Sequence, residues 1–274
     1  MSALLPGGLL AAVRLSPLDI ELVALMREHM MPALLATVRI GACFAWIPYL
    51  SPGVMPSKMS RSVIAVMVVI GLWPQLQGHA LPPDTLGMGL AALREAVIGT
   101  ALGLVVALPF HVFHGMGAIV DNQRGAGIGA MLDPVSGVEA TETANLIQLM
   151  SVVVFLATGG LVVLLEVLQA SFVLAPLGGP IQLQLSAITG FAGTVLAGAV
   201  RMALPVLLLL FLVEVLLGVL SRFAQQMNPF SVSLAVKSFI AFVALLFYLM
   251  PTVTQQVPEL RERTDPLQML AAPP

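Results

Sequence analysis

The chain has 274 residues, of which 58% are hydrophobic and only 9% are charged, and its formal net charge at pH 7 is −2. Ordinary soluble domains carry roughly 25% charged residues. The composition therefore excludes such a domain and predicts a membrane-class protein, or one that buries nearly all of its surface in a complex. No block of basic residues is present, which argues against nucleic acid as a partner. The single cysteine, Cys43, excludes an internal disulfide.

The N-terminal residues, 1–29, are expected to form a head that precedes the long apolar runs. Residues 9–13 are too short for the apolar core of a signal peptide, and Arg14 follows them instead of preceding them. We therefore expect the first long apolar helix to act as its own insertion signal. Residues 18–27 are compatible with a short amphipathic helix at an interface.

Two apolar runs open the region 30–250, which we expect to form one helical domain. The runs occupy residues 30–50 and 62–73, and serine, proline and glycine cluster between them. The connection also carries Lys58 and Arg61. Two basic residues on a short loop mark that loop as cytoplasmic by the positive-inside rule.

Two longer runs follow. Residues 91–119 are enough to cross a bilayer at about 1.5 Å per residue. Arg94-Glu95 lies near the start of this run and suits a helix entrance, and Pro109 is expected to bend the helix. The next run, 146–177, is expected to break at Gly159-Gly160.

The C-terminal part is expected to hold two runs within residues 188–220, separated by Arg201 and Pro205. A polar insertion at 221–237 and a last apolar run at 238–250 follow. No alternation typical of strands is present.

We predict an all-α fold of about six to eight helices. Its parts are the head 1–29, the helical domain 30–250 and a polar C-terminal tail 251–274.

The most unusual stretch, residues 120–145, lies between the third and fourth apolar runs. Gly125, Gly127 and Gly129 alternate with other small or apolar residues, and Asp133-Pro134 is a turn dipeptide. Lipid would leave the peptide groups of such a bent segment unpaired. We therefore expect this central loop to face water or other protein, inside a conduit.

Four charged residues lie within or against apolar helices: Arg39, Glu166, Glu214 and Lys237. A charge that faces lipid costs at least several kcal/mol on most scales. These charges, with many small residues, indicate helices packed against protein neighbours. Lys237 or Arg222 could pair with Glu214 or Glu166, and the sequence does not decide between these pairs.

Other candidate sites are weaker. His111 and His114 share one helix face, but no third metal ligand is evident. The glycine alternation lacks the preceding strand and the lysine of a phosphate-binding loop. Glu166 or Glu214 could instead be a proton-relay carboxylate, as in transporters. The sequence shows no arrangement of a nucleophilic residue with a general base, so we expect neither an enzyme nor a cofactor.

Five segments carry family-like motifs, in order along most of residues 30–250. They are Arg94-Glu95-Ala96-Val97-Ile98-Gly99 with Leu102-Gly103, Asp121-Asn122-Gln123-Arg124-Gly125-Ala126, Asp133-Pro134 with Ser136-Gly137, Gly159-Gly160, and residues 220–228 with Val236-Lys237-Ser238. Together they resemble SctT, an export-apparatus component of type III secretion systems whose flagellar homologue is FliR. The second and last segments are the most specific, and they favour the virulence or symbiosis branch. The head is longer than this resemblance leads us to expect.

The resemblance implies that one copy joins several copies of two small partners, SctR and SctS, in a pseudo-helical hetero-oligomeric export gate. The helices would form bent hairpins in a multi-pass protein of the bacterial inner membrane, with much of the chain held above the membrane plane. SctU, the inner rod and needle, membrane lipid and the secreted unfolded proteins would be further partners. No cofactor is implied.

The resemblance also implies that the central loop protrudes into the channel and contributes to a plug. A glycine-alanine strip can pack closely when shut and rearrange at low steric cost, and apolar side chains would form the seal. The candidate plug residues are Arg124, Gly125, Gly127, Ile128, Gly129, Met131, Leu132, Asp133 and Pro134. The candidate polar contacts between helices or subunits are Arg39, Glu95, Asn122, Gln123, Glu166, Glu214, Arg222, Gln225, Asn228 and Lys237.

Two functions therefore remain. The first is a structural and gating subunit of a protein-export portal, and the second is a small-molecule or ion transporter that acts alone. Transporters often have repeated halves, and we find no convincing internal repeat. A transporter should purify as a monomer or small homo-oligomer, whereas a portal subunit should co-purify with SctR and SctS in a particle several-fold heavier than 28.8 kDa.

Overall fold

The computed structural model describes residues 17–51, 54–77, 82, 84–126, 141–179, 185–223 and 229–263. Within these ranges the regular elements are all helical, which confirms the predicted all-α class. The elements are α1 (Pro17–Trp46), the 3-10 helix η1 (Pro48–Leu50), α2 (Lys58–Gly71), α3 (Trp73–Leu76), α4 (Thr85–Gln123), α6 (Glu142–Ala157), α7 (Gly160–Leu174), α8 (Leu185–Phe223) and α9 (Pro229–Arg263).

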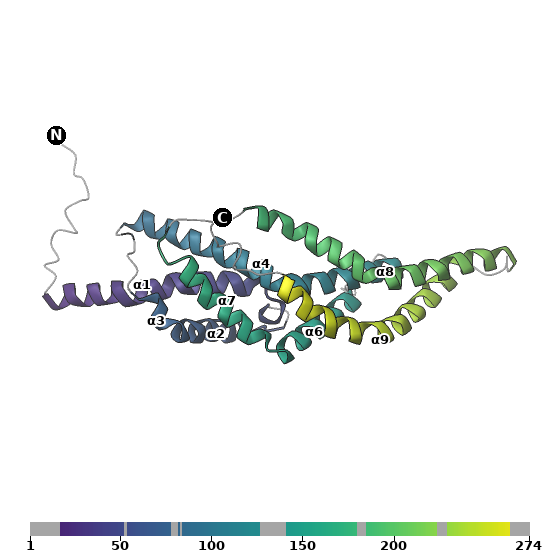
Figure 1. Ribbon diagram of the computed structural model, residues 1–274, viewed down its shortest axis with the longest axis horizontal. Coiled ribbons are helices and arrows are strands. Elements are labelled where there is room, and N and C mark those ends of the chain that lie inside the picture. The colour runs from purple at the N-terminus through teal and green to yellow at the C-terminus, as the bar shows by residue number, and fades with distance from the viewer. Residues whose placement is uncertain are drawn as a thin grey trace, which may run out of the picture.

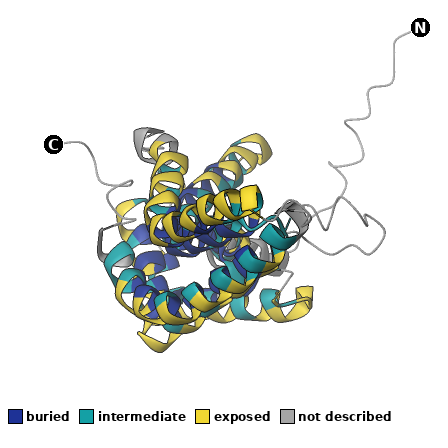
Figure 2. Ribbon diagram, turned by 90° about the vertical axis from the view of Figure 1, so that its right-hand side faces the viewer, coloured by how far each residue is buried: buried dark blue, intermediate teal, exposed yellow. Residues whose placement is uncertain are grey.

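Helix α4 lies at the centre of an elongated bundle (Figure 1). It packs most extensively against α1, α6 and α8. Helices α1 and α2 lie toward one end of the bundle, and α8 and α9 extend as a pair toward the other end (Figure 1). The buried residues gather in the middle of the bundle, while the outward faces of the helices are exposed (Figure 2).

Three helices are longer than the sequence predicted. Helix α1 joins the expected short N-terminal helix to the first apolar run, across Pro32. Helix α8 is one helix that continues through Pro205, and α9 continues through Pro251 and Pro258 into the expected polar tail. In apolar surroundings a broken helix leaves peptide groups unpaired, so continuing past a proline costs less than ending the helix.

Helix α4 begins earlier than expected, at Thr85. The Asp84 side chain caps it by accepting a hydrogen bond from the Gly87 amide at 2.9 Å. Arg94 and Glu95 therefore lie inside the helix and are buried, 4% and 0% exposed. The expectation that they mark a helix entrance is wrong, because the apolar run is preceded by a further capped stretch of helix.

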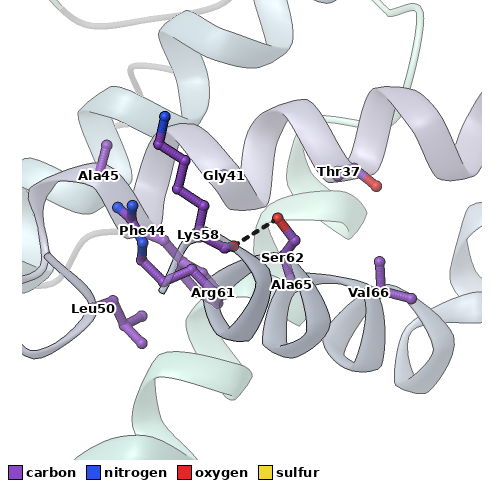
Figure 3. Close-up of a pocket in the computed structure, with 10 residues that line it drawn as sticks. All are labelled: Thr37, Gly41, Phe44, Ala45, Leu50, Lys58, Arg61, Ser62, Ala65 and Val66. Carbon is purple, nitrogen blue, oxygen red and sulfur yellow. Dashed lines mark hydrogen bonds between the residues drawn. The ribbon is translucent and has the colours of Figure 1, made fainter. Parts of the chain in front are cut away.

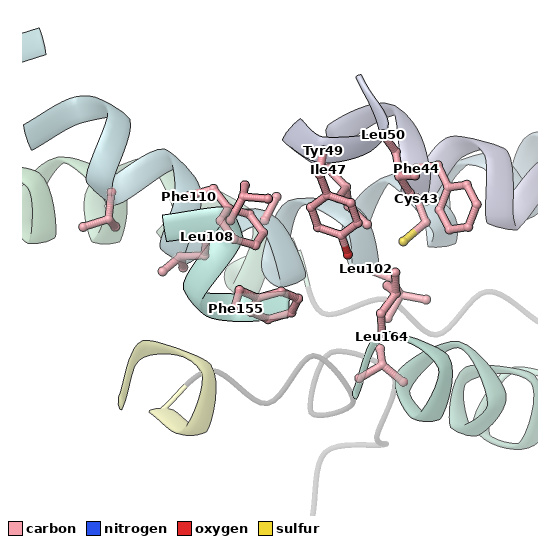
Figure 4. Close-up of a cluster of buried hydrophobic side chains, with 14 of the residues drawn as sticks. Cys43, Phe44, Ile47, Tyr49, Leu50, Leu102, Leu108, Phe110, Phe155 and Leu164 are labelled. Atoms are coloured by element: carbon pink, nitrogen blue, oxygen red, sulfur yellow. The ribbon is translucent and has the colours of Figure 1, made fainter. Parts of the chain in front are cut away.

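Glycines let α1 and α4 cross in backbone contact. A Cβ atom at Gly99 would overlap the Arg39 carbonyl, and one at Gly103 would lie 2.5 Å from the Cys43 carbonyl oxygen. Close approach at small residues is how membrane-class helices associate. Beside this crossing, the Phe110 ring contacts Tyr49 and Phe155 edge-on, at centroid distances of 6.0 and 5.0 Å (Figure 4).

Helices α6 and α7 form a bent pair, with an angle of 76° between them. Gly159 at the bend has φ +79°, a left-handed conformation that favours glycine. The predicted break at Gly159-Gly160 is therefore confirmed.

Three helical segments of the described chain are long and apolar enough to cross a membrane, and the bent pair can be counted as a fourth. The three segments are Thr85–Gln123, Gly190–Phe223 and Val232–Leu260. The first is mostly buried in the protein, but only 22% of the apolar window is buried in each of the other two. Helices α8 and α9 therefore present apolar faces that require lipid or further protein, as expected of a membrane-class protein.

Candidate functional site

The central loop connects the end of α4 at Gln123 to the start of α6 at Glu142. Residues 127–140 lie outside the described residues, so the structure places only Arg124 and Gly125 of the predicted plug residues. The others are Gly127, Ile128, Gly129, Met131, Leu132, Asp133 and Pro134. The described geometry therefore concerns the two ends of the loop, where it leaves α4 and enters α6.

A buried carboxylate joins these two ends. Asp121, which is 1% exposed, accepts a hydrogen bond from Arg124 Nε at 2.9 Å and one from the Ala144 backbone amide at 3.1 Å. The Arg124 guanidinium also donates to Thr143 Oγ1 at 3.0 Å. Two residues at the first end of the loop are thus bonded directly to two residues at its other end.

Asp121 does the capping that α6 lacks at its own N-terminus. Thr141, in the N-cap position, makes no side-chain capping bond. The Ala144 amide is one of the unpaired donors of the first turn, and it is satisfied by the Asp121 carboxylate from α4. A negative charge at this end of a helix is also favoured by the helix dipole. The start of α6 is therefore held by the end of α4.

Close packing and backbone conformation support the same junction. A Cβ atom at Gly117 would overlap the Ala144 backbone, so α4 and α6 touch here. Gly125 has φ +84°, which ends α4 in a left-handed conformation. The Arg124 guanidinium lies 5.0 Å from the centroid of the Phe242 ring of α9. Both ends of the loop are thereby attached to α4, α6 and α9.

An apolar cavity of about 220 Å³ adjoins this junction between α6 and α9. Thr143 and Phe242, which belong to the junction, also line the cavity. Its remaining walls are apolar side chains, which suit an apolar side chain as occupant.

A second charged cluster lies at the other end of α4. Arg39 of α1 and Glu95 of α4 form an ion pair at 2.6 Å, and neither side chain is exposed. Arg94 pairs with the other carboxylate oxygen of Glu95. One buried carboxylate is thus shared by two guanidinium groups, which leaves the cluster with a net positive charge.

The two arginines cap the C-terminus of α7. Arg39 donates to the carbonyl oxygens of Ser171 and Ala175 at 2.9 and 2.7 Å, and Arg94 donates to that of Pro176 at 3.0 Å. Helix α7 has no basic residue in its own last turn. Cations near a helix C-terminus satisfy its orphan carbonyls and suit its dipole, so α7 depends on α1 and α4 for this cap.

Helix α4 thus holds the bent pair at both of its ends. Asp121 fixes the start of α6, while Arg94 and Glu95, together with Arg39, fix the end of α7. The central loop leaves from the first of these anchors. The arrangement fixes both ends of the bent pair through paired polar groups in an apolar interior.

The other predicted polar contacts are scattered. Lys237 of α9 pairs with Glu214 of α8 at 3.1 Å, and the Glu214 side chain remains 52% exposed. Glu166, Arg222 and Asn122 are exposed, and Gln123 is half-buried. Gln225 and Asn228 lie outside the described residues.

Sequence reasoning did not single out Asp121, Thr143, Ser171 or the capping role of Arg94. Asp121 and Arg94 stood inside the motif segments, so a signal was present. The partners of Ser171 and Thr143 depend on tertiary contacts that the sequence does not show.

His111, considered for metal binding, contacts the Phe191 ring. Over the described ranges, no group of three His, Cys, Asp or Glu residues could hold a metal ion.

Comparison with known proteins gives consistent matches. The family model "Bacterial export proteins, family 1" matches residues 30–263. The chain is 39% identical over 225 residues to "Surface presentation of antigens protein SpaR" of Salmonella typhimurium, covering 82% of this chain and 85% of that protein. It is 27% identical to "Yop proteins translocation protein T" of Yersinia pestis, covering 90% and 96%. It is 25% identical to "Flagellar biosynthetic protein FliR" of Escherichia coli, covering 79% and 83%.

Proposed function

The chain belongs to the bacterial export proteins of family 1, the SctT/FliR family of type III export apparatus components, and we propose that it is the subunit whose central loop gates the export channel. In this role it joins SctR and SctS subunits to form the entry portal, with SctU and the inner rod and needle as further neighbours. The cargo is unfolded protein.

The observation that carries this proposal is the double attachment of the central loop. Asp121, Arg124 and Thr143 bond the two ends of the loop to each other and to α4 and α6. A gate must open and close at its tip while its base stays in place, because movement at the base would disrupt the packed helices. A loop of small residues on a base of buried, paired charges meets both requirements.

The exposed apolar faces support the assembly part of the proposal. Phe211 and Leu216 of α8 and Phe247 of α9 are each at least 60% exposed. Soluble monomers rarely expose contiguous apolar patches of this kind. In the proposed assembly, sister subunits and lipid together cover these faces.

The same faces bear on localisation. Three to four apolar helices and membership in an export family point to a multi-pass protein of the bacterial inner membrane. Helix α2 and the apolar part of α1, Met30–Trp46, are shorter than a full span. Because these helices do not reach across a bilayer, we propose that part of the assembly is held above the membrane plane while α1 and α2 stay in contact with lipid.

Two measurements test the proposal. The full-length chain is co-expressed with SctR and SctS from the same bacterium, purified in mild detergent and weighed. A photo-crosslinking amino acid is then placed at Met131 in the loop, or at Met59 on α2 as a control, while a secreted substrate is stalled in the channel. We expect a heteromeric particle several-fold heavier than 28.8 kDa and substrate crosslinks from position 131 alone. A lone monomer or homodimer would instead favour the transporter alternative, and a heteromeric particle without crosslinks from position 131 would refute the gating role.

A further inference from the structure

A cavity of about 310 Å³ lies between α1 and α2, far from the central loop in the sequence. Its apolar walls include Phe44 and Leu50 near one end and Val66 at the other (Figure 3). Lys58 and Arg61, from the first turns of α2, lie at the same end as Phe44 and Leu50 (Figure 3). Thr37 lies at the same end as Val66, and its hydroxyl is already bonded to the Ala33 carbonyl oxygen. The cavity therefore has a cationic end and an end without charge, which we call the apolar end.

The two cations have no counter-charge in the described part of the chain. The ion pairs there involve other residues. Arg61 Nε is buried and has no hydrogen-bond partner in the protein. A buried N–H that loses its water without gaining an acceptor is costly. The charge and this unsatisfied donor indicate an anionic ligand.

The apolar end continues onto the outer surface of α2. Val63, Met67 and Ile70 are 44%, 67% and 63% exposed, on a helix that belongs to a membrane-class protein. Gly41 of α1 faces the cavity without a side chain, and a Cβ atom there would meet nothing within 4 Å. Space therefore runs from the cations along an apolar surface, which is the shape of a headgroup followed by a hydrocarbon chain.

We propose that this pocket binds an anionic phospholipid, with the headgroup phosphate between Lys58 and Arg61 and an acyl chain along α1 and α2. Basic pockets between membrane helices bind anionic headgroups in this way. An arginine donates to phosphate through several N–H groups, which suits the unpaired Arg61 Nε. The site does not depend on the gating role of the central loop.

Native mass spectrometry of the full-length protein in mild detergent tests the proposal. Phosphatidylglycerol, phosphatidylcholine of the same acyl chains, or inorganic phosphate is added to delipidated protein. We expect phosphatidylglycerol to be retained preferentially. Replacement of either cation, Lys58→Gln or Arg61→Gln, should weaken that retention about fivefold, because a cation near a membrane surface contributes about that factor.

Matched controls separate the pocket from general effects. Gly41→Leu fills the cavity without touching its charges and should also reduce retention. Gly89→Leu adds the same side chain at another helical glycine with open space around it and should leave retention unchanged. Arg222→Gln removes an exposed cation outside the pocket and should also leave retention of the lipid unchanged. The proposal is overturned if phosphatidylcholine binds equally well, if phosphate alone binds as tightly as the lipid, or if the pocket variants behave like their controls.

Discussion

Arg39 and Glu95 form a fully buried ion pair although they lie 56 positions apart in the sequence. The guanidinium also packs over the Phe172 ring at 4.1 Å and donates to two carbonyls at the end of α7. One side chain therefore ties together α1, α4 and α7. An apolar interior makes such a pair costly to break, because either charge left alone would be desolvated without a partner.

Replacing Glu95 with glutamine should destabilise the protein strongly. Glutamine keeps the shape of the side chain but leaves Arg39 and Arg94 without their shared anion. Breaking a buried pair in this way costs about 3–5 kcal/mol. Thermal unfolding in detergent, followed by circular dichroism, should show a clear drop in the unfolding temperature. Glu166→Gln, at an exposed position of α7, is the matched control and should change stability by less than about 0.5 kcal/mol.

Replacing either of two glycines of α4 with alanine should change the stability of the protein, in opposite directions at the two positions. At Gly99 the new methyl group would overlap the Arg39 carbonyl, so α1 and α4 must separate. Overpacking of this kind costs about 1–3 kcal/mol. At Gly89 the methyl group enters open space, and alanine should stabilise the helix by roughly 0.5–1 kcal/mol. Equal changes in unfolding temperature for the two variants would contradict the crossing geometry.

Much of the fold could be predicted because it depends on local signals. The all-α class follows from composition and periodicity, and the bend at Gly159 follows from a glycine pair in an apolar run. The ends of the helices were harder to predict from the sequence. Asp84 caps α4 well before the apolar run, and the helix continues across Pro109 because apolar surroundings penalise a break more than a lost hydrogen bond.

The candidate site was predictable only in part, for a different reason. The sequence marks the central loop and the buried charges, but it does not say which partners they find. Asp121 caps a helix that begins 21 positions later, at Glu142, in place of Thr141, the local residue with the right chemistry. The pairing of Lys237 with Glu214 was one of several left open. Tertiary packing decides both contacts.

Removing the Asp121 carboxylate should loosen the start of α6. In Asp121→Ala the Ala144 amide loses its acceptor and Arg124 loses its counter-charge. Loss of an N-cap costs about 0.5–2 kcal/mol. Hydrogen exchange of the amides of residues 143–145, measured by mass spectrometry, should become faster. Thr141→Ala is the control: it removes the residue in the N-cap position, which makes no capping bond, and should leave that exchange unchanged.

Changes in the central loop should affect the channel without affecting the fold. On the proposed gating role, Gly127→Val or deletion of residues 125–131 should alter ion leakage across the inner membrane or the amount of protein secreted. A branched side chain prevents close packing of the strip, and the deletion removes most of it. Both effects are measured in whole cells, with assembly of the particle checked separately. If ion leakage and secretion both stay at wild-type levels in these variants, the loop is not a plug.

The pair between Lys237 and Glu214 should tolerate reversal of its charges. Lys237 is largely buried while Glu214 is half exposed, and they lie 3.1 Å apart on α9 and α8. A single change, Lys237→Glu, places two carboxylates together near an apolar surface and should lower the unfolding temperature. The double variant Lys237→Glu with Glu214→Lys restores the attraction, which for a partly exposed pair contributes up to about 1 kcal/mol, and should recover most of the loss. No recovery would mean that the two side chains act separately, with Lys237 held by its surroundings on α9 and not by Glu214.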